Sequence, residues 1–324
     1  MIEPKSLIIP HLEAQKTCYV AYSGGVDSTV LLYEVGEAAK DLKCNVVAIH
    51  INHEYSKKSK RWEKHCESFC KNYGFEFKKF SFNSNTLKGS SLESLMRDER
   101  YKIFEKVLKK DEILFMGHHL DDQIETLLFR MLRGSGLKGS SSIPMKRGLG
   151  NGFLVRPFLK LAKYDLIEIA KNKKLKYVED DSNDDIKFDR NYLRKEVLPK
   201  ISERWPNYRK SFSKYIDNHK TSYEFLRETS TQELKNILDG ENIRLDKLKE
   251  YESNYQKILI LSWLELKKCK LPNSQVLDEL TNTFLNANKS SQPKFIWGSK
   301  EKGNYVCELI PIPQKVLPSI DISI

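Results

Sequence analysis

The sequence predicts an α/β protein in which a doubly wound, mainly parallel sheet is followed by a smaller, mainly helical domain. Up to about residue 117, short runs of β-branched and aromatic residues alternate with longer amphipathic runs, and beyond residue 207 most of the chain has helical periodicity. Strands that alternate with helices form βαβ units, whose strands are parallel. We therefore expect two domains, residues 1–206 and residues 207–324, that meet near Trp205-Pro206-Asn207.

The individual elements follow from this periodicity and from the turn residues between them. Strands are predicted at residues 18–22, 45–51, 75–81 and 112–116, with helices at residues 28–39, 60–72 and 92–109 between them. A long loop rich in glycine and serine is predicted over residues 133–152, then a helix at 164–173, an acidic polar stretch at 179–185 and a segment at 190–201. The second domain should contain helices at 208–236, 245–269 and 274–285, with strand-like runs at 294–297 and 305–310.

Composition excludes several classes of protein. With 40% hydrophobic and 31% charged residues the 324-residue chain has the composition of a soluble globular protein, and no apolar run is long enough to span a membrane. Six cysteines without CxxC spacing indicate reduced thiols, and the N-terminus lacks the order of a signal peptide, so we expect a cytoplasmic protein. The excess of 55 basic over 44 acidic residues gives a net charge of +11, which favours a polyanionic partner.

Two adjacent glycines follow the first predicted strand directly. The segment reads Ser23-Gly24-Gly25-Val26-Asp27-Ser28, and a helix-like run follows it. Glycines let the backbone approach a ligand closely, and the unpaired amides at a helix start favour an anion. The turn therefore predicts a nucleotide phosphate site, although a turn in which Asp27 or Ser28 only caps the helix would look the same.

Asp27 stands where a Walker A loop would have its lysine. A carboxylate beside phosphates is repulsive unless a cation lies between them. Magnesium is the cation that is usually held by few protein ligands together with the oxygens of the nucleotide. Asp27 therefore predicts a magnesium ion and a second acidic ligand.

A second polar cluster follows the strand predicted at residues 112–116. It reads Gly117-His118-His119-Leu120-Asp121-Asp122-Gln123-Ile124-Glu125-Thr126. Helical spacing places Asp122 and Glu125 on one face together with His118, opposite an apolar face. Acids in a first helical turn also stabilise the helix dipole, which is the simpler interpretation. However, the carboxyl ends of parallel strands meet at one edge of a sheet, so this cluster and Asp27 are expected to face one site.

With these motifs in place, the chain resembles the N-type ATP-pyrophosphatases of the PP-loop superfamily, whose phosphate loop reads SGGxDS, and within them the tRNA(Ile)-lysidine synthases. The matching segments are residues 23–28, His118 to Gln123 with Glu125-Thr126, Arg133-Gly134-Ser135-Gly136, Arg156-Pro157, Asp181-Ser182-Asn183, and Arg190-Asn191 with Arg194. Their order over residues 15–206 carries the resemblance, which is weaker beyond Trp205. It implies a Rossmann-like sheet of the adenine nucleotide alpha hydrolase type.

The resemblance also implies a reaction. Such enzymes split ATP between its α and β phosphates, adenylate the wobble cytidine of the CAU anticodon of a minor isoleucine tRNA, and let free L-lysine displace AMP to give lysidine. By this resemblance, the loop of residues 23–28 and Gly117 bind ATP, and Asp27 and Asp122 hold magnesium. Glu125 and His118 are candidates for positioning lysine or for taking a proton from its ammonium group.

Arginines supply the remaining candidates. Glu93, Arg97 and Arg100 share one side of a predicted helix, where they would otherwise form an ordinary surface ion-pair ladder. The similar helix of the family carries its arginines into the active site, so Arg97 and Arg100 are expected at ATP and Glu93 at the substrate. Four further arginines stand in the family-like motifs and are therefore expected to bind phosphate or substrate: Arg133, Arg156, Arg190 and Arg194.

A metal site formed by other histidines and cysteines is less well supported by the sequence. His50, His53, His65, Cys66 and Cys70 invite a zinc site, but the spacing of the two cysteines fits one face of an amphipathic helix. His50 is at the end of the second predicted strand, where it would border the nucleotide. The family often continues this strand as His-Gly-Leu-Arg, and this chain does not.

Three alternatives remain open at this point. A tRNA thiolation enzyme of the same fold usually needs a cysteine pair or an iron–sulfur cluster, and an amidating synthetase needs an ammonia source. A non-catalytic RNA-binding protein would have little use for Asp27, Asp122 and Glu125.

Many members of the family have a further C-terminal tRNA-binding module, before which this chain is expected to end. A homodimer is compatible with the sequence, which leaves the oligomeric state open.

Overall fold

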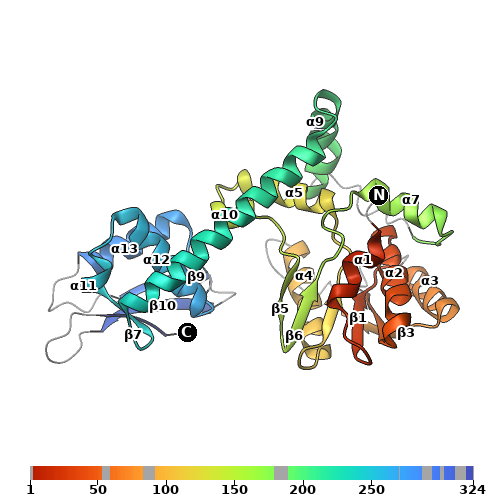
Figure 1. Ribbon diagram of the computed structural model, residues 1–324, viewed down its shortest axis with the longest axis horizontal. Coiled ribbons are helices and arrows are strands. Elements are labelled where there is room, and N and C mark those ends of the chain that lie inside the picture. Colours follow the sequence, from red (N-terminus) through yellow and green to blue (C-terminus); the bar gives the residue numbers. More distant parts are fainter. Residues whose placement is uncertain are drawn as a thin grey trace. The chain divides into compact units, whose positions relative to one another are not determined.

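The computed structural model describes residues 3–52, 59–82, 92–178, 189–269, 271–286, 294–299, 303–310 and 319–323 (Figure 1). His53 and the motif Asp181-Ser182-Asn183, with the acidic stretch predicted around it, lie outside these residues. The chain divides into two compact units, Met1–Lys220 and Thr221–Ile324.

A six-stranded sheet organises the first unit. Its strands are β1 (Thr17–Ala21), β2 (Asn45–Asn52), β3 (Glu76–Ser81), β4 (Ile113–Phe115), β5 (Lys146–Leu149) and β6 (Gly152–Val155), in the order β3-β2-β1-β4-β6-β5. The pairs β1·β2, β2·β3, β1·β4 and β4·β6 are parallel, and only β5 is antiparallel to its neighbour. The predicted mainly parallel sheet is thus confirmed.

Helices cover both faces of this sheet, which makes it doubly wound (Figure 1). The helices of the first unit before residue 189 are α1 (Pro4–Ile8), α2 (Val26–Leu42), α3 (Ser59–Tyr73), α4 (Leu92–Val107), α5 (Leu120–Met131), α6 (Leu137–Ser140) and α7 (Lys163–Asn172), with a 3₁₀ turn at Ile9–His11. Alternate residues of β1 separate the two cores, as strand geometry requires. Val20 packs in the core that contains α2, α3 and α7, whereas Tyr19 packs in the core that contains Phe104 of α4.

The prediction of a long loop over residues 133–152 is wrong. This stretch contains α6 and strand β5, which pairs with β6 in a hairpin that turns at Gly150-Asn151, where Gly150 has a φ of 55°. A left-handed glycine suits the tight turn of a hairpin. The segment before the hairpin is tied to α5 because the Gln123 side chain donates to Ile143 O (3.0 Å) and accepts from Ile143 N (2.7 Å).

Three short helical pieces replace the single segment predicted at residues 190–201. They are α8 (Asp189–Tyr192), a π-helical turn (Leu193–Val197) and α9 (Leu198–Arg204). Pro199 stands at the start of α9, where its missing N–H cannot complete a regular helical bond to the preceding turn. Arg194 therefore lies in the wider π turn, a feature that often occurs at functional sites.

The second unit is mainly helical and also contains a five-stranded sheet. It consists of the second half of α10 (Tyr208–Ile237) with α11 (Leu245–Leu248), α12 (Ser253–Leu266) and α13 (Ser274–Leu285), and the sheet order is β7-β8-β11-β10-β9. These strands are β7 (Leu238–Asp239), β8 (Asn242–Arg244), β9 (Lys294–Ser299), β10 (Gly303–Ile310) and β11 (Ser319–Ser323). Trp263 is buried at the centre of this unit and donates from Nε1 to Glu241 O at 2.8 Å.

Helix α10 contributes residues to both units, because the division by internal contacts falls at Lys220. The boundary predicted near residue 206 precedes this helix, and the functional extents 1–206 and 207–324 stay predictions. None of the helices in the described ranges is long and apolar enough to cross a membrane.

Candidate functional site

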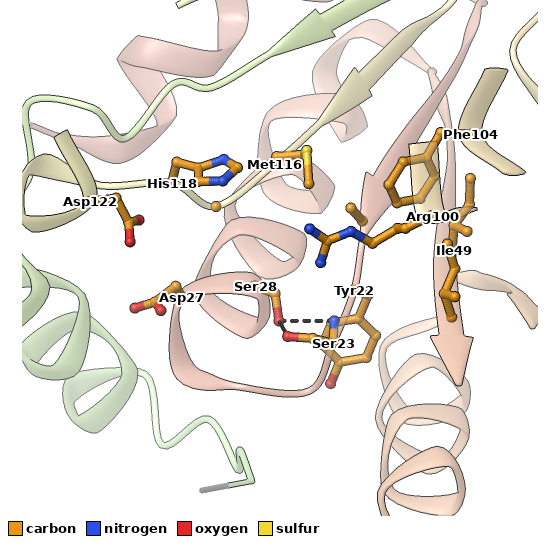
Figure 2. A pocket seen from close by; sticks show the side chains of 13 residues that line it. Tyr22, Ser23, Asp27, Ser28, Ile49, Arg100, Phe104, Met116, His118 and Asp122 are labelled. Atoms are coloured by element: carbon orange, nitrogen blue, oxygen red, sulfur yellow. Dashed lines mark hydrogen bonds between the residues drawn. The ribbon is translucent and has the colours of Figure 1, made fainter. Parts of the chain in front are cut away.

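A pocket of about 220 Å³ opens at the carboxyl ends of β1 and β4 (Figure 2). The chain order reverses at β1, since β2 and β4 lie on either side of it, and ligands bind at such switch points. Seven of the residues predicted for the site line this pocket: Ser23, Asp27, Ser28, Arg100, Gly117, His118 and Asp122. Figure 2 shows Asp27 and Asp122 near one another at one end, while Arg100 points in from the other.

The loop between β1 and α2 is held in shape by its own hydroxyl groups. Ser28 Oγ lies 3.1 Å from Ser23 Oγ and donates to Gly25 O at 3.0 Å, and Ser23 N donates to Ser28 Oγ at 3.2 Å. The first bond of the helix joins Thr29 N to Gly25 O. The amides of the three residues before Thr29 therefore have no helical acceptor, so they can bind an anion.

Gly24 is required by both its backbone angle and its surroundings. Its φ is 90°, in the left-handed region, and a Cβ at this position would lie 2.8 Å from Cys66 Sγ. Its carbonyl accepts a hydrogen bond from Val178 N at 2.8 Å. The turn is thus fixed by contacts with α3 and with the chain that follows α7.

We expect Gly24→Ala to lower the free energy of unfolding by about 2 kcal/mol, because the change combines left-handed strain with the contact to Cys66. Urea denaturation measures the loss. In a Cys66→Ala background the same change should cost less, since the Sγ atom has gone. Equal costs in both backgrounds would show that the contact with the thiol is unimportant.

Gly117 brings the second loop against the first. A Cβ on Gly117 would lie 3.0 Å from Asp27 O and 3.3 Å from Ser28 N, which are backbone atoms at the start of α2. Backbone at a helix start cannot move without disturbing the helix. The absence of a side chain at Gly117 therefore allows the two loops to touch.

His119 lies between the carboxylates of the site. Its Nε2 is 3.7 Å from Asp27 Oδ2 and 3.6 Å from Asp122 Oδ2, and its ring is buried. The His119 amide also donates to Asp122 Oδ2 at 2.9 Å, which caps the first turn of α5. Because the two carboxylates approach the same nitrogen, Asp27 and Asp122 converge as the sequence predicted.

Burial affects the two acids differently. It raises the pKa of Asp27, whose Oδ1 is buried without a hydrogen-bond partner in the described part of the chain. Burial also acts to raise the pKa of Asp122, but the nearby His119 ring and the His119 amide outweigh it and hold that pKa below its usual value. An unpartnered buried carboxylate oxygen beside a second, ionised carboxylate is a donor set that fits a hard divalent cation.

His118 is held by a buried arginine. Arg156 Nε donates to His118 Nδ1 at 3.2 Å, while Arg156 Nη1 donates to Pro144 O at 2.8 Å. Burial lowers the pKa of His118 to about 3, so its ring is neutral near pH 7. Since Nδ1 accepts a hydrogen bond, the single ring proton is on Nε2, and His118 can only donate from that atom.

Arg156 therefore positions a residue of the pocket and has little access to solvent. Its side chain is 2% exposed, and its guanidinium also donates to the Tyr101 hydroxyl at 3.5 Å. The sequence suggested a phosphate or substrate ligand here. In the structure this arginine contacts His118 and Tyr101, and its role as a ligand of phosphate or substrate stays a prediction.

Arginines surround Tyr101 on three sides. Arg97 Cζ is 5.5 Å and Arg147 Cζ is 4.8 Å from the centroid of its ring, and Arg156 contacts its hydroxyl. Burial acts to raise the pKa of Tyr101, but the positive charges of Arg156, Arg97 and Arg147 outweigh it and lower that pKa to about 8. Tyr101 thus joins α4 to β5 and to the residue that holds His118.

This cluster predicts that Tyr101 titrates near pH 8 in the folded protein. From about pH 8 to the ordinary tyrosine value of 10.0, the folded chain has released a proton that the unfolded chain still holds, so the free energy of unfolding should rise with pH in that window. Ultraviolet difference absorbance of the phenolate, with Tyr101→Phe subtracted, measures the titration. A Tyr101 signal that appears only near pH 10 would contradict the charge arrangement.

Glu125 is buried and paired. Arg194 donates to it through two bonds, Nε to Oε1 at 2.7 Å and Nη2 to Oε2 at 2.8 Å, and Arg194 Nη2 is 3.7 Å from Asp122 Oδ1. Burial raises the pKa of Glu125, although Arg194 opposes this shift. Asp122, Glu125 and Arg194 thus form one charge cluster, and Glu125 and Arg194 do not line the pocket itself.

The other predicted residues do not line the pocket. Arg133 is exposed, with its guanidinium 4.0 Å from the ring centroid of Phe129 and 3.4 Å from Asp189 Oδ2, and Arg190 follows in α8. Gly25 and Val26 belong to the loop and Glu93 to the first turn of α4. His50 is buried, with Nδ1 2.9 Å from Tyr22 O, and does not line the pocket.

Sequence reasoning missed several residues that build the site. They are His119, Asp121, Tyr101, Arg147 and Arg209. Asp121 accepts from Lys163 N and from Arg209 Nε, each at 2.8 Å. His119 and Asp121 stand in the motif His118 to Gln123, where no role was assigned to them, and Tyr101 stands four residues after Arg97 on the same helix.

A glycine turn at the switch point of a parallel sheet, with an acid in place of the usual lysine, defines an ATP-binding domain of the PP-loop class. The family described as PP-loop domain matches residues 3–201. The U34-tRNA thiolase NcsA from Methanococcus maripaludis, solved with its [4Fe-4S] cluster, superposes with a TM-score of 0.56 and 19% identity over 68% of this chain and 78% of its own. That likeness concerns the fold alone.

Curated relatives identify the family within this class. The tRNA(Ile)-lysidine synthase of Coxiella burnetii is 33% identical over 92% of this chain and 67% of its own length. The enzyme of the same name from Pseudomonas putida is 42% identical over 70% of this chain and 53% of its own length, and that from Buchnera aphidicola (strain Bp) is 34% identical over 86% and 64%. The chain belongs to the tRNA(Ile)-lysidine synthase family, and it spans between about half and two thirds of the lengths of these relatives.

Proposed function

We propose that this chain ligates free L-lysine to the wobble cytidine of the CAU anticodon of a minor isoleucine tRNA, with ATP as co-substrate. The cytidine is first adenylated with release of pyrophosphate, and the amine of lysine then displaces AMP. The observation that carries the proposal is the convergence of Asp27 and Asp122 on His119 beside a phosphate loop, in a chain whose relatives are named tRNA(Ile)-lysidine synthase. A tRNA substrate also suits the cytoplasm.

The loop of residues 23–28 binds the pyrophosphate part of ATP in this proposal. Its free amides and the hydroxyls of Ser23 and Ser28 are fixed before the ligand arrives, so they stabilise charge on the leaving group without rearranging. Arg100 lines the same pocket and adds a positive charge on the side opposite the acids. Gly117 keeps the second loop close enough for both loops to contact one nucleotide.

Asp27 and Asp122 would hold a magnesium ion. Magnesium neutralises phosphate charge as pyrophosphate leaves. The Oδ1 of Asp27, which has no hydrogen-bond partner among the described residues, and the ionised Asp122 are the protein oxygens for this role. The His119 ring lies between the two carboxylates and keeps them at a fixed spacing.

His118 acts as a hydrogen-bond donor in this proposal. Its Nδ1 accepts from Arg156, so its Nε2–H is directed at a ligand in the pocket, where it can orient a phosphoryl or carbonyl oxygen. A ring whose pKa is lowered to about 3 accepts a proton poorly at neutral pH. Glu125 is then the remaining candidate for positioning lysine or for taking a proton from its ammonium group, although Arg194 donates to both of its oxygens and it does not line the pocket.

The thiolation alternative finds little support in the cysteines. All six are free, and Cys66 and Cys70, which lie on the helix that contacts the phosphate loop, are buried in α3. Burial raises the pKa of each of these two thiols to about 12, which disfavours the thiolate that nucleophilic sulfur chemistry needs.

The homodimer that the sequence allows stays a prediction.

Incubation with labelled ATP, lysine and a minor isoleucine tRNA transcript bearing the CAU anticodon tests the proposal. We expect AMP and pyrophosphate, with turnover that needs both tRNA and lysine. Changing the anticodon to CAC in the same transcript is the matched control and should abolish turnover if the chain alone recognises its substrate. Formation of ADP and phosphate would overturn the proposal, as would formation of AMP that does not depend on tRNA.

A further inference from the structure

A second hollow of about 540 Å³ lies in the first unit and shares no lining residue with the pocket described above. Its walls are the chain around Lys160, the first turn of α7 with Tyr164, and the start of α10 with Arg209, Lys210 and Lys214. We call it the α7–α10 groove.

Positive charge dominates this groove. Four basic residues line it against two acids, Asp165 and Asp217. Asp165 caps α7 by accepting from Ala162 N at 2.8 Å, and Asp217 is 3.5 Å from Lys160 Nζ. The acids are thus already engaged, and the net charge that remains is positive.

Lys210 and Lys214 are the basic groups without partners. Both are exposed and stand one helical turn apart on α10, and neither forms an ion pair within the described part of the chain. Like charges at this spacing repel each other. A bound anion between them would remove that repulsion.

Aromatic surface accompanies the charge. Tyr164 is 60% exposed although it lines the groove, and the Arg209 guanidinium lies 5.9 Å from its ring centroid and 4.8 Å from that of Tyr208. A planar arginine beside an open tyrosine ring offers a surface on which an unpaired base can stack. Lysines beside such a surface suit the phosphates of the same strand.

The groove adjoins the catalytic pocket through three consecutive residues of α5. Leu120 lines the groove, Asp121 binds Arg209, and Asp122 lines the pocket. A strand that lies in the groove therefore passes beside the first turn of α5.

We propose that the α7–α10 groove binds unpaired RNA next to the reacting nucleotide, with Lys210 and Lys214 at phosphates and Tyr164 under a base. The proposal rests on the proposed function, because it assigns a binding surface for the same tRNA. The juxtaposition of two lysines that form no ion pair within the described residues, an arginine beside two tyrosine rings and an open tyrosine ring favours RNA over an acidic protein segment, which would not need the aromatic surface.

Fluorescence anisotropy with a labelled anticodon stem–loop and with the whole tRNA tests the groove. We expect Lys210→Gln/Lys214→Gln to weaken binding roughly tenfold and to reduce the slope of log affinity against log salt by about 1.5. Tyr164→Ala should weaken binding roughly tenfold with little change in that slope, because stacking releases no counterions. In steady state the KM for tRNA should rise while kcat at saturating tRNA stays near its original value.

Lys106→Gln/Lys110→Gln is the matched control, because it removes two exposed lysines at and just beyond the end of α4, where the chain approaches the amino end of β4. Its affinity for RNA should match that of the unchanged chain. Affinity for ATP reports that each variant is folded.

If the groove variants bind RNA as tightly as the original chain, while the original chain turns over tRNA, the proposed RNA-binding role of the groove is overturned. An acidic protein segment is then its occupant. An equal loss of RNA affinity in the Lys106→Gln/Lys110→Gln control also overturns the proposal, since nonspecific electrostatic attraction would then explain binding. Failure of the proposed function looks different, because the unchanged chain itself would then form no AMP that depends on tRNA.

Discussion

Asp27→Asn is expected to reduce tRNA-dependent AMP formation by about 10³-fold or more, while affinity for tRNA changes little. The amide keeps the shape of the side chain and removes its charge, so the phosphates lose the electrostatic partner that the site provides. Stability should not suffer. Burial raises the pKa of Asp27 and its Oδ1 has no hydrogen-bond partner in the described residues, so a neutral side chain relieves a desolvation cost.

Glu37→Gln is the matched control, since it neutralises a more exposed acid on the same helix. It should leave turnover unchanged. Thermal denaturation without nucleotide compares the stability of the variants. If Asp27→Asn lowered tRNA affinity as much as turnover, or unfolded the protein, Asp27 would be a structural residue and its proposed cation role would be lost.

Glu125→Gln should reduce kcat/KM for lysine by about 100-fold, which corresponds to ~3 kcal/mol for loss of a buried charged contact. Release of pyrophosphate in a single turnover should persist, because the adenylation step does not involve the amine of lysine. Rapid-quench measurement of pyrophosphate and AMP in the same reaction separates the two steps.

Arg194→Gln distinguishes the two roles that Glu125 can have. If Glu125 only anchors Arg194, both variants lose the same bidentate pair and should show the same defect. If Glu125 receives the lysine amine, Arg194→Gln should retain more lysine-dependent turnover than Glu125→Gln. Loss of pyrophosphate release in Glu125→Gln would contradict the assignment to the second step.

The sequence predicted the parallel core because the relevant signals are local. β1, β2 and β4 are short, mainly apolar runs and β3 contains two phenylalanines, and each strand is followed by an amphipathic helix or a turn with a recognisable chemical character. Placing the loop after β1 next to the loop after β4 needed only the rule that parallel strands end at one edge. The pairing of Asp27 with Asp122 could therefore be predicted from the sequence alone.

The hairpin of β5 and β6 was missed for a specific reason. Glycines and serines between residues 133 and 152 conceal β5, a strand of only four residues in which Lys146 and Gly148 have low strand propensity. The Gly150-Asn151 turn was a usable signal. What fixes the strand in place is its pairing with β6 at the sheet edge, a tertiary contact that overrides local preference.

Long-range ion pairs could not be predicted from one sequence. Arg194 and Glu125 are 69 positions apart and Arg209 and Asp121 are 88 positions apart, so no periodicity connects them. The sequence placed Arg156 and Arg194 at the substrate because arginine suits phosphates. Only the fold shows that Arg156 donates to His118 and that Arg194 donates to Glu125.

Gly117 has a mechanical consequence. Because a Cβ on Gly117 would lie only 3.0 Å from the carbonyl oxygen of Asp27, the separation of the two loops is set by main chain on both sides and cannot be adjusted by a change of rotamer. A core substitution under β4 that displaces this strand slightly would therefore alter the spacing of Asp27 and Asp122 without touching either side chain. Divalent-ion affinity should thus be sensitive to packing several residues away, so that the precision of this site depends on the rigidity of the sheet beneath it.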